Sequence, residues 1–341
     1  MFPGLPLDLF HPHDWIQGIT DIGTISAATI NKLSGGSLHM SWTAQLNSLL
    51  AARKHDLILS IGQVVPHEVM GMSGHNKNIL IGTGGYDTIH KTHYLSAIYG
   101  IERTLGRANN PMKDLLNHAS TNFLDGWPIV YVLTVLSLDK VGKLKIRGLY
   151  IGTDYECFTK ATSLSLNINV RLLDSPLEKI VVYLDPNEYH STWLGNKSIY
   201  RTRLAIKDGG ELIVLAPGLR EFGEHQELDR LIRKYGYAGS SRILSAVEEN
   251  SDLQKALSAA AHLIHGSSEN RFNITYCPGF LTSDEINQVN YQYKELDPML
   301  KRYNPQTMQE GFNTLPNGEI IYFIHNPAIG LWAHKDRFQK H

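Results

Sequence analysis

The chain has 341 residues, of which 42% are hydrophobic and 19% are charged, a balance typical of a globular protein with a sizeable core. Its formal net charge of −1 gives no electrostatic basis for binding nucleic acid or acidic membranes. No segment reaches the roughly 18 apolar residues of a membrane-spanning helix, and the first residues lack the pattern of a secretory signal. We therefore expect a cytoplasmic protein with no nucleic-acid partner and no membrane partner.

The two cysteines, Cys157 and Cys277, lie far apart in the sequence and belong to no metal-binding or redox motif. We expect both to be buried, reduced thiols, as in most cytosolic proteins. The length of the chain fits two domains of ordinary size.

The hydrophobic pattern predicts strands alternating with helices, which is typical of an α/β fold. The segment up to Trp15 shows no periodicity and is expected to be a loop. Buried strands are expected at 55–65, 127–139, 143–152, 178–185, 210–218, 272–279 and 318–327, with a turn at 140–142. Helices are expected at 86–106, 154–170, 192–206, 223–239 and 251–266. We predict two α/β domains, residues 1–160 and 161–341, with the cofactor and active-site cleft between them.

Glycines gather in the loop that follows the strand at 55–65, at positions 71, 74, 82, 84 and 85. Residues without a Cβ allow sharp turns and close approach to a ligand, and loop N–H groups before a helix can bind an anion. The loop is not a Walker motif, because Lys77 has no glycine before it and no serine or threonine after it. On the glycines alone, a tight-turn loop and a phosphate site both stay open.

Three histidines near this loop are candidates for chemistry. His67 directly follows a strand end, and an imidazole with an ordinary pKa of about 6.5 suits proton transfer. His90 and His93 lie on one face of the following helix, and either could bind a metal through a ring nitrogen. Taken singly, each histidine also fits a surface residue or a buried structural hydrogen-bond donor.

Taken together, the spacing of His67, Lys77 and His93 within "PHEVMGMSGHNKNILIG" and the later "THY" resembles the nickel-dependent lactate racemase family. The resemblance implies that His67 is an acid/base. It implies that Lys77 carries a covalently attached nickel-pincer nucleotide (pyridinium-3,5-bisthiocarboxylic acid mononucleotide nickel). It also implies that His93 coordinates the nickel.

The same resemblance places the loop residues Gly71, Ser73 and Gly74 at the cofactor. The family loop reads "SGG-x-K" and this chain reads "SGHNK", so His75 stands in place of the second glycine. The proteins that make the cofactor are implied as partners.

In the second half, "TWLGNKSIYRTR" resembles the substrate-binding helix of the family, which assigns Trp193 and Lys197 to the substrate. An ammonium group at Lys197 can pair with the carboxylate of a 2-hydroxy acid. Leu194 stands where the lactate enzymes have a glutamine, so we expect a sugar acid or another acid larger than lactate. Arg201 and Arg203 could serve a more polar acid, but we interpret them as surface charges on a helix.

No role is assigned to His262, His265 or Arg271, and the two histidines are expected to be structural. Two strings of the family pattern, "D-x-T-R-P" for cofactor binding and "GTHR" for a second acid/base histidine, do not occur in this sequence. They fall within roughly the first hundred residues of family members, so we expect the chain to open just after that region, with an incomplete N-terminal domain. His11 and His13 are then the nearest substitutes for the second histidine.

The resemblance implies an isomerase, a racemase or epimerase of a small 2-hydroxy acid. A histidine takes the hydroxyl proton while the α-hydrogen leaves as hydride to the cofactor, and the 2-keto acid regains the hydride on its other face. One alternative is a truncated or non-catalytic homologue that binds the cofactor or only retains the fold. Another is an NAD-type oxidoreductase, which the lack of a G-x-G-x-x-G motif after a strand disfavours.

Overall fold

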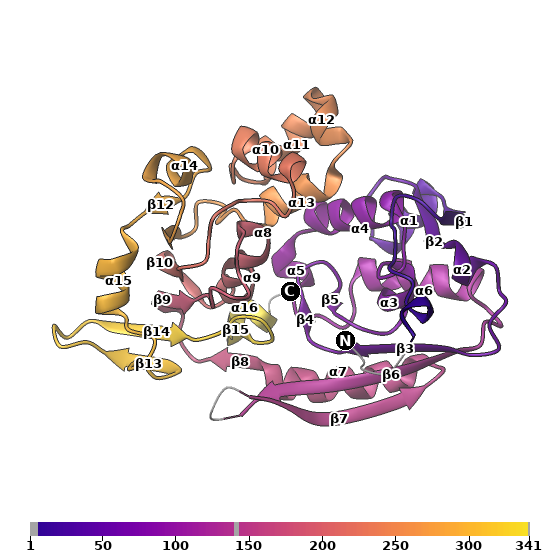
Figure 1. Cartoon of the computed structure of the whole chain (residues 1–341), viewed down its shortest axis with the longest axis horizontal. Helices are drawn as coiled ribbons and strands as arrows, with labels where there is room; N and C mark the ends of the chain where they lie inside the picture. The colour runs from indigo at the N-terminus through magenta and orange to yellow at the C-terminus, as the bar shows by residue number, and fades with distance from the viewer. Residues whose placement is uncertain (1–5, 140–142, 340–341) are drawn as a thin grey trace.

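The computed structural model describes residues 6–139 and 143–339, which form an N-terminal and a C-terminal part (Figure 1). The turn predicted at 140–142 lies outside the described residues. Strands and helices alternate through both parts, so the predicted α/β class is confirmed. Within the described ranges no helix is both long enough and apolar enough to cross a membrane.

Three small sheets with helices around them make up the N-terminal part. Its strands are β1 (Ile19–Ile25), β2 (Trp42–Asn47), β3 (Ile58–Gln63), β4 (Pro66–His67), β5 (Gly71–Met72), β6 (Ile129–Leu138) and β7 (Leu144–Gly152). Its helices are η1 (Leu7–Leu9), α1 (Ala27–Leu33), α2 (Ser48–Ala51), α3 (Asn76–Leu80), α4 (Tyr86–Tyr99), α5 (Ile101–Thr104), α6 (Pro111–Phe123) and α7 (Tyr155–Asn169). β3 pairs in parallel with β6, which pairs antiparallel with β7, and α7 covers one face of these strands (Figure 1).

A six-stranded sheet of order β12-β11-β10-β9-β14-β13 forms the centre of the C-terminal part. Its strands are β9 (Leu177–Tyr183), β10 (Ile206–Ala216), β11 (Asn273–Pro278), β12 (Gln292–Tyr293), β13 (Gly311–Thr314) and β14 (Ile320–Ile324), and a separate pair joins β8 (Val170–Leu173) to β15 (Leu331–His334). The helices are α8 (Thr192–Gly195), α9 (Lys197–Thr202), α10 (Gln226–Tyr235), α11 (Ser240–Glu249), α12 (Ser251–Gln254), α13 (Leu257–His265), α14 (Ser283–Gln288), α15 (Leu296–Arg302) and α16 (Lys335–Gln339). Only the edge strand β13 runs antiparallel to its neighbour in this sheet.

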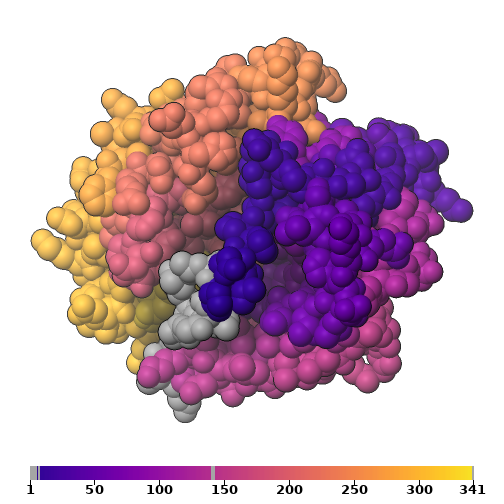
Figure 2. Space-filling view, turned by 45° about the vertical axis from the view of Figure 1, so that its right-hand side comes forward, coloured from indigo at the N-terminus to yellow at the C-terminus, as the bar shows by residue number. Residues whose placement is uncertain are grey.

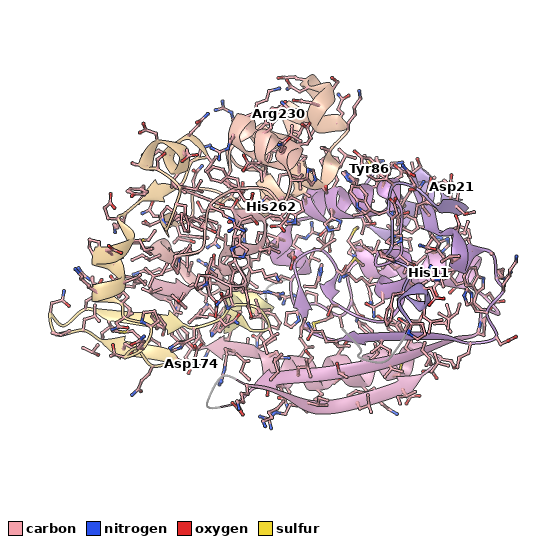
Figure 3. The ribbon with its side chains drawn as sticks, in the orientation of Figure 1. His11, Asp21, Tyr86, Asp174, Arg230 and His262 are labelled. Carbon is pink, nitrogen blue, oxygen red and sulfur yellow. The ribbon has the colours of Figure 1, made fainter. Side chains whose placement is uncertain are left out.

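Helix α4 belongs to the cores of both parts. Leu95 is buried in the N-terminal core, while Tyr94 and Ala97 are buried in the C-terminal core. The helix also packs against α13, where the backbone N–H of Ser258 donates to Nδ1 of His90 (3.4 Å). Figure 3 labels Tyr86 on α4 and His262 on α13 at this junction. Helix α4 therefore lies at the boundary of the two parts.

All seven predicted strands are present, and three predicted helices are broken. Among the described residues, further strands were not predicted, including β1, β2, β8, β12, β13 and β15. The helix expected at 86–106 ends at Gly100, whose φ of 107° leaves the helical region, and α5 follows it. The helix expected at 192–206 is interrupted at Asn196, and the helix expected at 251–266 is interrupted at Ala256, which has a φ of −126°. Both cysteines are free and buried, as predicted. The predicted boundary at residue 160 falls inside α7, and the division into two domains stays a prediction.

The β4–β5 hairpin depends on Gly71. This residue has a φ of 72°, and a Cβ added to it would lie 1.9 Å from the carbonyl oxygen of Arg107. We expect Gly71→Ala to lower the free energy of unfolding by about 3 kcal/mol or more, through backbone strain and steric overlap together. Urea denaturation measures this loss.

Gly126→Ala is the matched control, because Gly126 has a φ of 71° and a Cβ added to it would meet no atom within 4 Å among the described residues. The Gly126→Ala variant is expected to lose only the free energy of the backbone strain, about 1 kcal/mol of the free energy of unfolding. Equal losses in the two variants would contradict the packing role of Gly71.

Candidate active site between the two parts

The end of β3 and the hairpin after it position His67. The Ser73 hydroxyl donates to the carbonyl of Gln63 (2.7 Å) and accepts from the backbone N–H of Val65 (2.9 Å). These two bonds tie the glycine loop back to the strand end. Gly74, the next residue in the loop, has a φ of 92°, and its carbonyl accepts from the buried Lys113 ammonium (3.4 Å). Both Ser73 and Gly74 therefore make structural contacts within the loop. Their predicted role at a cofactor stays a prediction.

The His67 imidazole is held in one tautomer. The backbone N–H of Val69 donates to its Nδ1 (3.1 Å), so in the neutral ring Nε2 carries the proton. Burial lowers the pKa of His67 to about 3, against an opposing effect of Glu68, and the nearby Lys77, Arg201 and His93 lower it further. His67 is thus neutral at physiological pH and can donate a hydrogen bond from Nε2 to a ligand oxygen. Its lone pair is on Nδ1, which also accepts from the backbone N–H of Met70 (3.3 Å), so the ring can take up a proton only after it gives up these backbone bonds.

Lys77 lies in the first turn of α3. Burial lowers the pKa of its ammonium, and the carboxylate of Glu68 partly offsets this effect. No hydrogen bond or ion pair to Nζ is found among residues 6–139 and 143–339. A buried amine of lowered pKa without a fixed partner is suited to nucleophilic or covalent chemistry.

His93 is held in the opposite tautomer from His67. Its Nδ1 donates to the carbonyl of Ile89 one turn earlier in α4 (2.7 Å), which leaves the Nε2 lone pair available. Burial lowers the pKa of His93 and keeps the ring neutral. A neutral imidazole whose second nitrogen donates to a carbonyl is the usual form of a histidine metal ligand.

The structure brings these three residues together. Lys77 and His93 both lower the pKa of His67, and Lys77 lowers the pKa of His93, so the three groups lie within electrostatic reach of one another. No cluster of three or more His, Cys, Asp or Glu side chains able to hold a metal occurs in the part of the chain that the structure describes. A metal at His93 would therefore need most of its donors from a bound cofactor.

The C-terminal part contributes α8 and α9 to the same site. Lys197 opens α9, and its charge helps to lower the pKa of Glu68 beside His67. Trp193 on α8 is half-buried, with its ring 4.4 Å from that of His262 between centroids. Both predicted substrate residues thus come from the elements that face the hairpin across the boundary.

The interpretation of Arg201 and Arg203 as surface charges was wrong. Their exposed fractions are 3% and 2%. The Arg201 guanidinium donates to the carbonyl of Pro66 and lies 3.8 Å from the Glu68 carboxylate. It therefore holds the residues on both sides of His67.

Arg203 has a different, structural role at the same boundary. It donates to Glu102 on α5 (3.2 Å) and to the carbonyl of His265 (2.9 Å). Arg271 donates to the same carboxylate (2.9 Å) and to Asp208 (2.8 Å). These bonds join α5 to the C-terminal part and occupy the two arginines.

Three buried groups were missed by sequence reasoning. Burial raises the pKa of Glu68, but His67, Arg201 and Lys197 outweigh it and hold that pKa well below its usual range. Burial lowers the pKa of Lys113 to about 7, with Lys77 adding to the effect. His265 was expected to be structural, yet its Nε2 is buried without a hydrogen-bond partner among the described residues. In the sequence, the position of Glu68 directly after His67 could have indicated a role for Glu68. No comparable pattern indicates Lys113 or His265.

Two other histidines are occupied by structural contacts. His75 has a φ of 59° and places its ring 3.9 Å from that of Tyr131, so an aromatic pocket accommodates the residue that replaces a glycine. His13 donates to the carbonyl of Gly84 (2.9 Å) and accepts from Asn47 (3.1 Å). His11 is exposed, and Figure 2 shows the N-terminal segment in indigo over the boundary between the two parts.

His262 is the structural histidine that the sequence predicted. Its Nδ1 bonds to the Tyr200 hydroxyl (2.8 Å) and its Nε2 to the Tyr237 hydroxyl (2.9 Å). Burial lowers its pKa to about 3, and His265 adds to this effect.

These contacts predict how stability depends on pH. Between pH 3 and about 6.5, His262 is protonated in the unfolded chain but neutral in the folded chain. Because unfolding takes up this proton, the free energy of unfolding rises with pH over this window. In His262→Gln the slope is expected to be smaller by up to about 1.4 kcal/mol per pH unit, as measured by urea denaturation at several pH values. The exposed His39→Gln is the control. An unchanged slope in His262→Gln would contradict the buried neutral state.

Comparisons with known proteins agree with this geometry. Residues 36–104, which contain His67, Lys77 and His93, match the lactate racemase N-terminal domain. A crystal structure of a Thermotoga maritima protein superposes with a TM-score of 0.78 at 23% identity, covering 95% of this chain and 77% of that one. The lactate racemase apoprotein from Thermoanaerobacterium thermosaccharolyticum superposes with a TM-score of 0.68 at 17% identity, covering 94% and 70%. No curated protein matches the sequence. Residues 36–104 are thus similar in sequence to the lactate racemase N-terminal domain, and the chain is similar in fold to these two solved structures.

Proposed function

We propose that this chain binds a nickel-pincer nucleotide and interconverts the stereoisomers of a 2-hydroxy acid. The observation that carries the proposal is the convergence of His67, Lys77 and His93 at the boundary of the two parts, where burial lowers the pKa of all three groups. Proteins that make the cofactor would supply it.

The chemistry of the donor set fits this group. Lys77 offers a buried amine of lowered pKa, which favours the neutral nucleophile needed for an amide- or thioamide-type linkage. His93 offers an Nε2 lone pair, because Nδ1 is committed to the carbonyl of Ile89. When bound, the group would supply nickel and a hydride acceptor, chemistry that no protein side chain provides.

The protein's own residues would bind the acid and handle its proton. The ammonium of Lys197 would pair with the carboxylate, and the half-buried Trp193 would cover an apolar part of the substrate. His67 would donate from Nε2 to the substrate oxygen. To take up the hydroxyl proton, the ring would release the backbone N–H groups of Val69 and Met70 and turn Nδ1, which holds its lone pair, toward the hydroxyl, and the product is an imidazolium. The apolar Leu194 beside these residues supports an acid other than lactate, such as a sugar acid or another larger acid.

Replacing the lysine tests cofactor attachment. Lys77→Ala, produced in cells that also make the cofactor, is expected to lose the covalent adduct entirely, because its only proposed anchor is gone. Intact-mass spectrometry measures the adduct. Lys91→Ala, on a partly exposed ion pair with Asp87, is the matched control and keeps the adduct. An adduct on Lys77→Ala would refute the attachment site.

Replacing the histidine tests metal coordination separately. His93→Ala is expected to keep the organic adduct but to lose at least tenfold in bound nickel, because the single protein donor is removed. Elemental analysis gives the nickel content. His90→Phe, three residues earlier on α4, keeps a ring to stack on Tyr86 and should retain full nickel. Equal nickel in His93→Ala and the unmodified protein would show that another group binds the metal.

A non-catalytic homologue that binds the cofactor is the second candidate, because the lone pair of His67 is on Nδ1, where it accepts from the backbone N–H of Val69. Fully loaded protein, incubated with a panel of 2-hydroxy acids in deuterated water, distinguishes the two. Inversion at C2 supports the isomerase. Stable loading without inversion of any acid supports the non-catalytic alternative.

A further inference from the structure

The outer face of the β3–β6–β7 sheet, opposite α7, is aliphatic and uncovered. Side chains on this face or at its end have exposed fractions of 37–71%, namely Leu57, Leu59, Ile61, Leu138, Leu144, Ile146, Leu149 and Ile151. Exposed leucine and isoleucine are common singly, but a continuous patch of this kind is unusual in a monomer.

The strand register shows that these residues form one surface. Ile61 on β3 lies beside Val132 on β6, which lies beside Ile151 on β7. Further along the same two strands, Leu136 pairs with Ile146 and Leu138 pairs with Leu144. Cross-strand neighbours project from the same face, so aliphatic rows cross the sheet.

The opposite face of β6 is buried, because its residues from Ile129 to Ser137 alternate between buried and partly exposed. Parallel strands such as β3 and β6 are normally covered on both faces, whereas here only one face is covered by the described residues.

We infer that two copies of this chain associate by packing these outer faces against each other. The exposed aliphatic side chains present roughly 800 Å², which is what each partner contributes to an interface of standard size and more than the largest apolar patch of a typical monomer. Among the described strand residues the polar side chains of this face are Gln63 and Thr134, so it carries no charge that would select a charged partner. An uncharged apolar surface is complementary to itself, as a two-fold interface requires.

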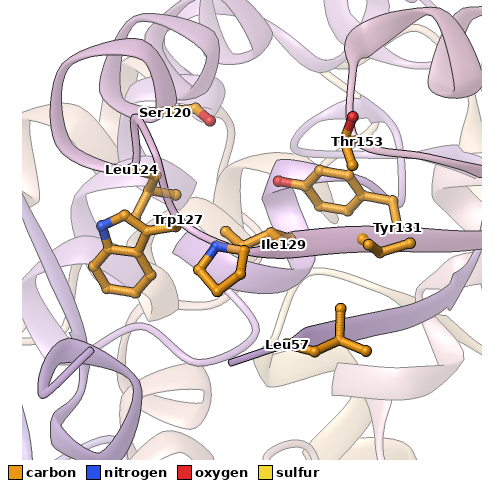
Figure 4. Close-up of a pocket in the computed structure, with 9 residues that line it drawn as sticks. Leu57, Ser120, Leu124, Trp127, Ile129, Tyr131 and Thr153 are labelled. Carbon is orange, nitrogen blue, oxygen red and sulfur yellow. The ribbon is translucent and has the colours of Figure 1, made fainter. Parts of the chain in front are cut away.

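A separate concavity lies at the end of β3 and β6. This pocket of about 280 Å³ is lined by Leu57, Trp127 and Tyr131 among others (Figure 4). Ile129 and Tyr131 project from the covered face of β6, so the inference rests on the outer face and not on this pocket.

Sedimentation velocity of the full chain over a range of concentrations tests the inference. The unmodified protein is expected to sediment at twice the mass of the 38.3 kDa chain. Ile61→Lys and Ile146→Lys place a charge at the two most exposed positions of the face, where no monomer packing is lost, and each should weaken dimerisation at least 100-fold. A double Ile61→Thr, Ile146→Thr variant keeps β-branched strand residues and should weaken it in the same direction.

Ile320→Lys is the matched control, because Ile320 is 61% exposed on β14 of the other sheet. It should leave the dimer unchanged. A monomer at every concentration would overturn the inference and leave the face to a different partner. The inference would also be overturned if the protein is a dimer and every variant at Ile61 and Ile146 leaves that dimer intact.

Discussion

The contact between Arg201 and the backbone and carboxylate on either side of His67 is the interaction on which the candidate site depends. The guanidinium comes from α9 in the C-terminal part, and its partners Pro66 and Glu68 belong to the N-terminal part. Arg201 is buried and Glu68 is partly buried, with exposed fractions of 3% and 20% for the side chains. A buried carboxylate that lost this partner would pay a large desolvation cost, so the hairpin and α9 hold their positions together.

The same contact explains the protonation states around it. Arg201 and Lys197 supply positive charge that keeps Glu68 ionised, while burial keeps His67 and His93 neutral. Backbone groups then select the tautomers: the N–H of Val69 fixes a proton on Nε2 of His67, and the carbonyl of Ile89 frees Nε2 of His93. The two imidazoles thus present different forms of Nε2, protonated at His67 and with a lone pair at His93, which are the forms that their proposed roles use.

Much of this could be read from the sequence because it depends on local spacing. The strand before His67, the glycine loop and the helix with His93 follow from hydrophobic runs and glycine positions within forty residues. Arg201 could not be recognised in this way, because its burial arises from two segments 135 residues apart in the chain. The break of the predicted helix at Asn196 has the same origin, since its side chain is committed to the Tyr276 and Tyr291 hydroxyls from distant elements.

The uncovered sheet face and the candidate site share a strand. Gln63 ends β3, and its carbonyl accepts from Ser73 in the glycine loop, while Ile61 two residues earlier projects from the outer face. β3 is an edge strand held on one side by β6, so its end has fewer constraints than a central strand. Packing against the outer face would restrain β3 directly. The restraint would reach His67 through the Ser73 bonds, so association on one face of the sheet would stiffen the loop that carries the chemistry.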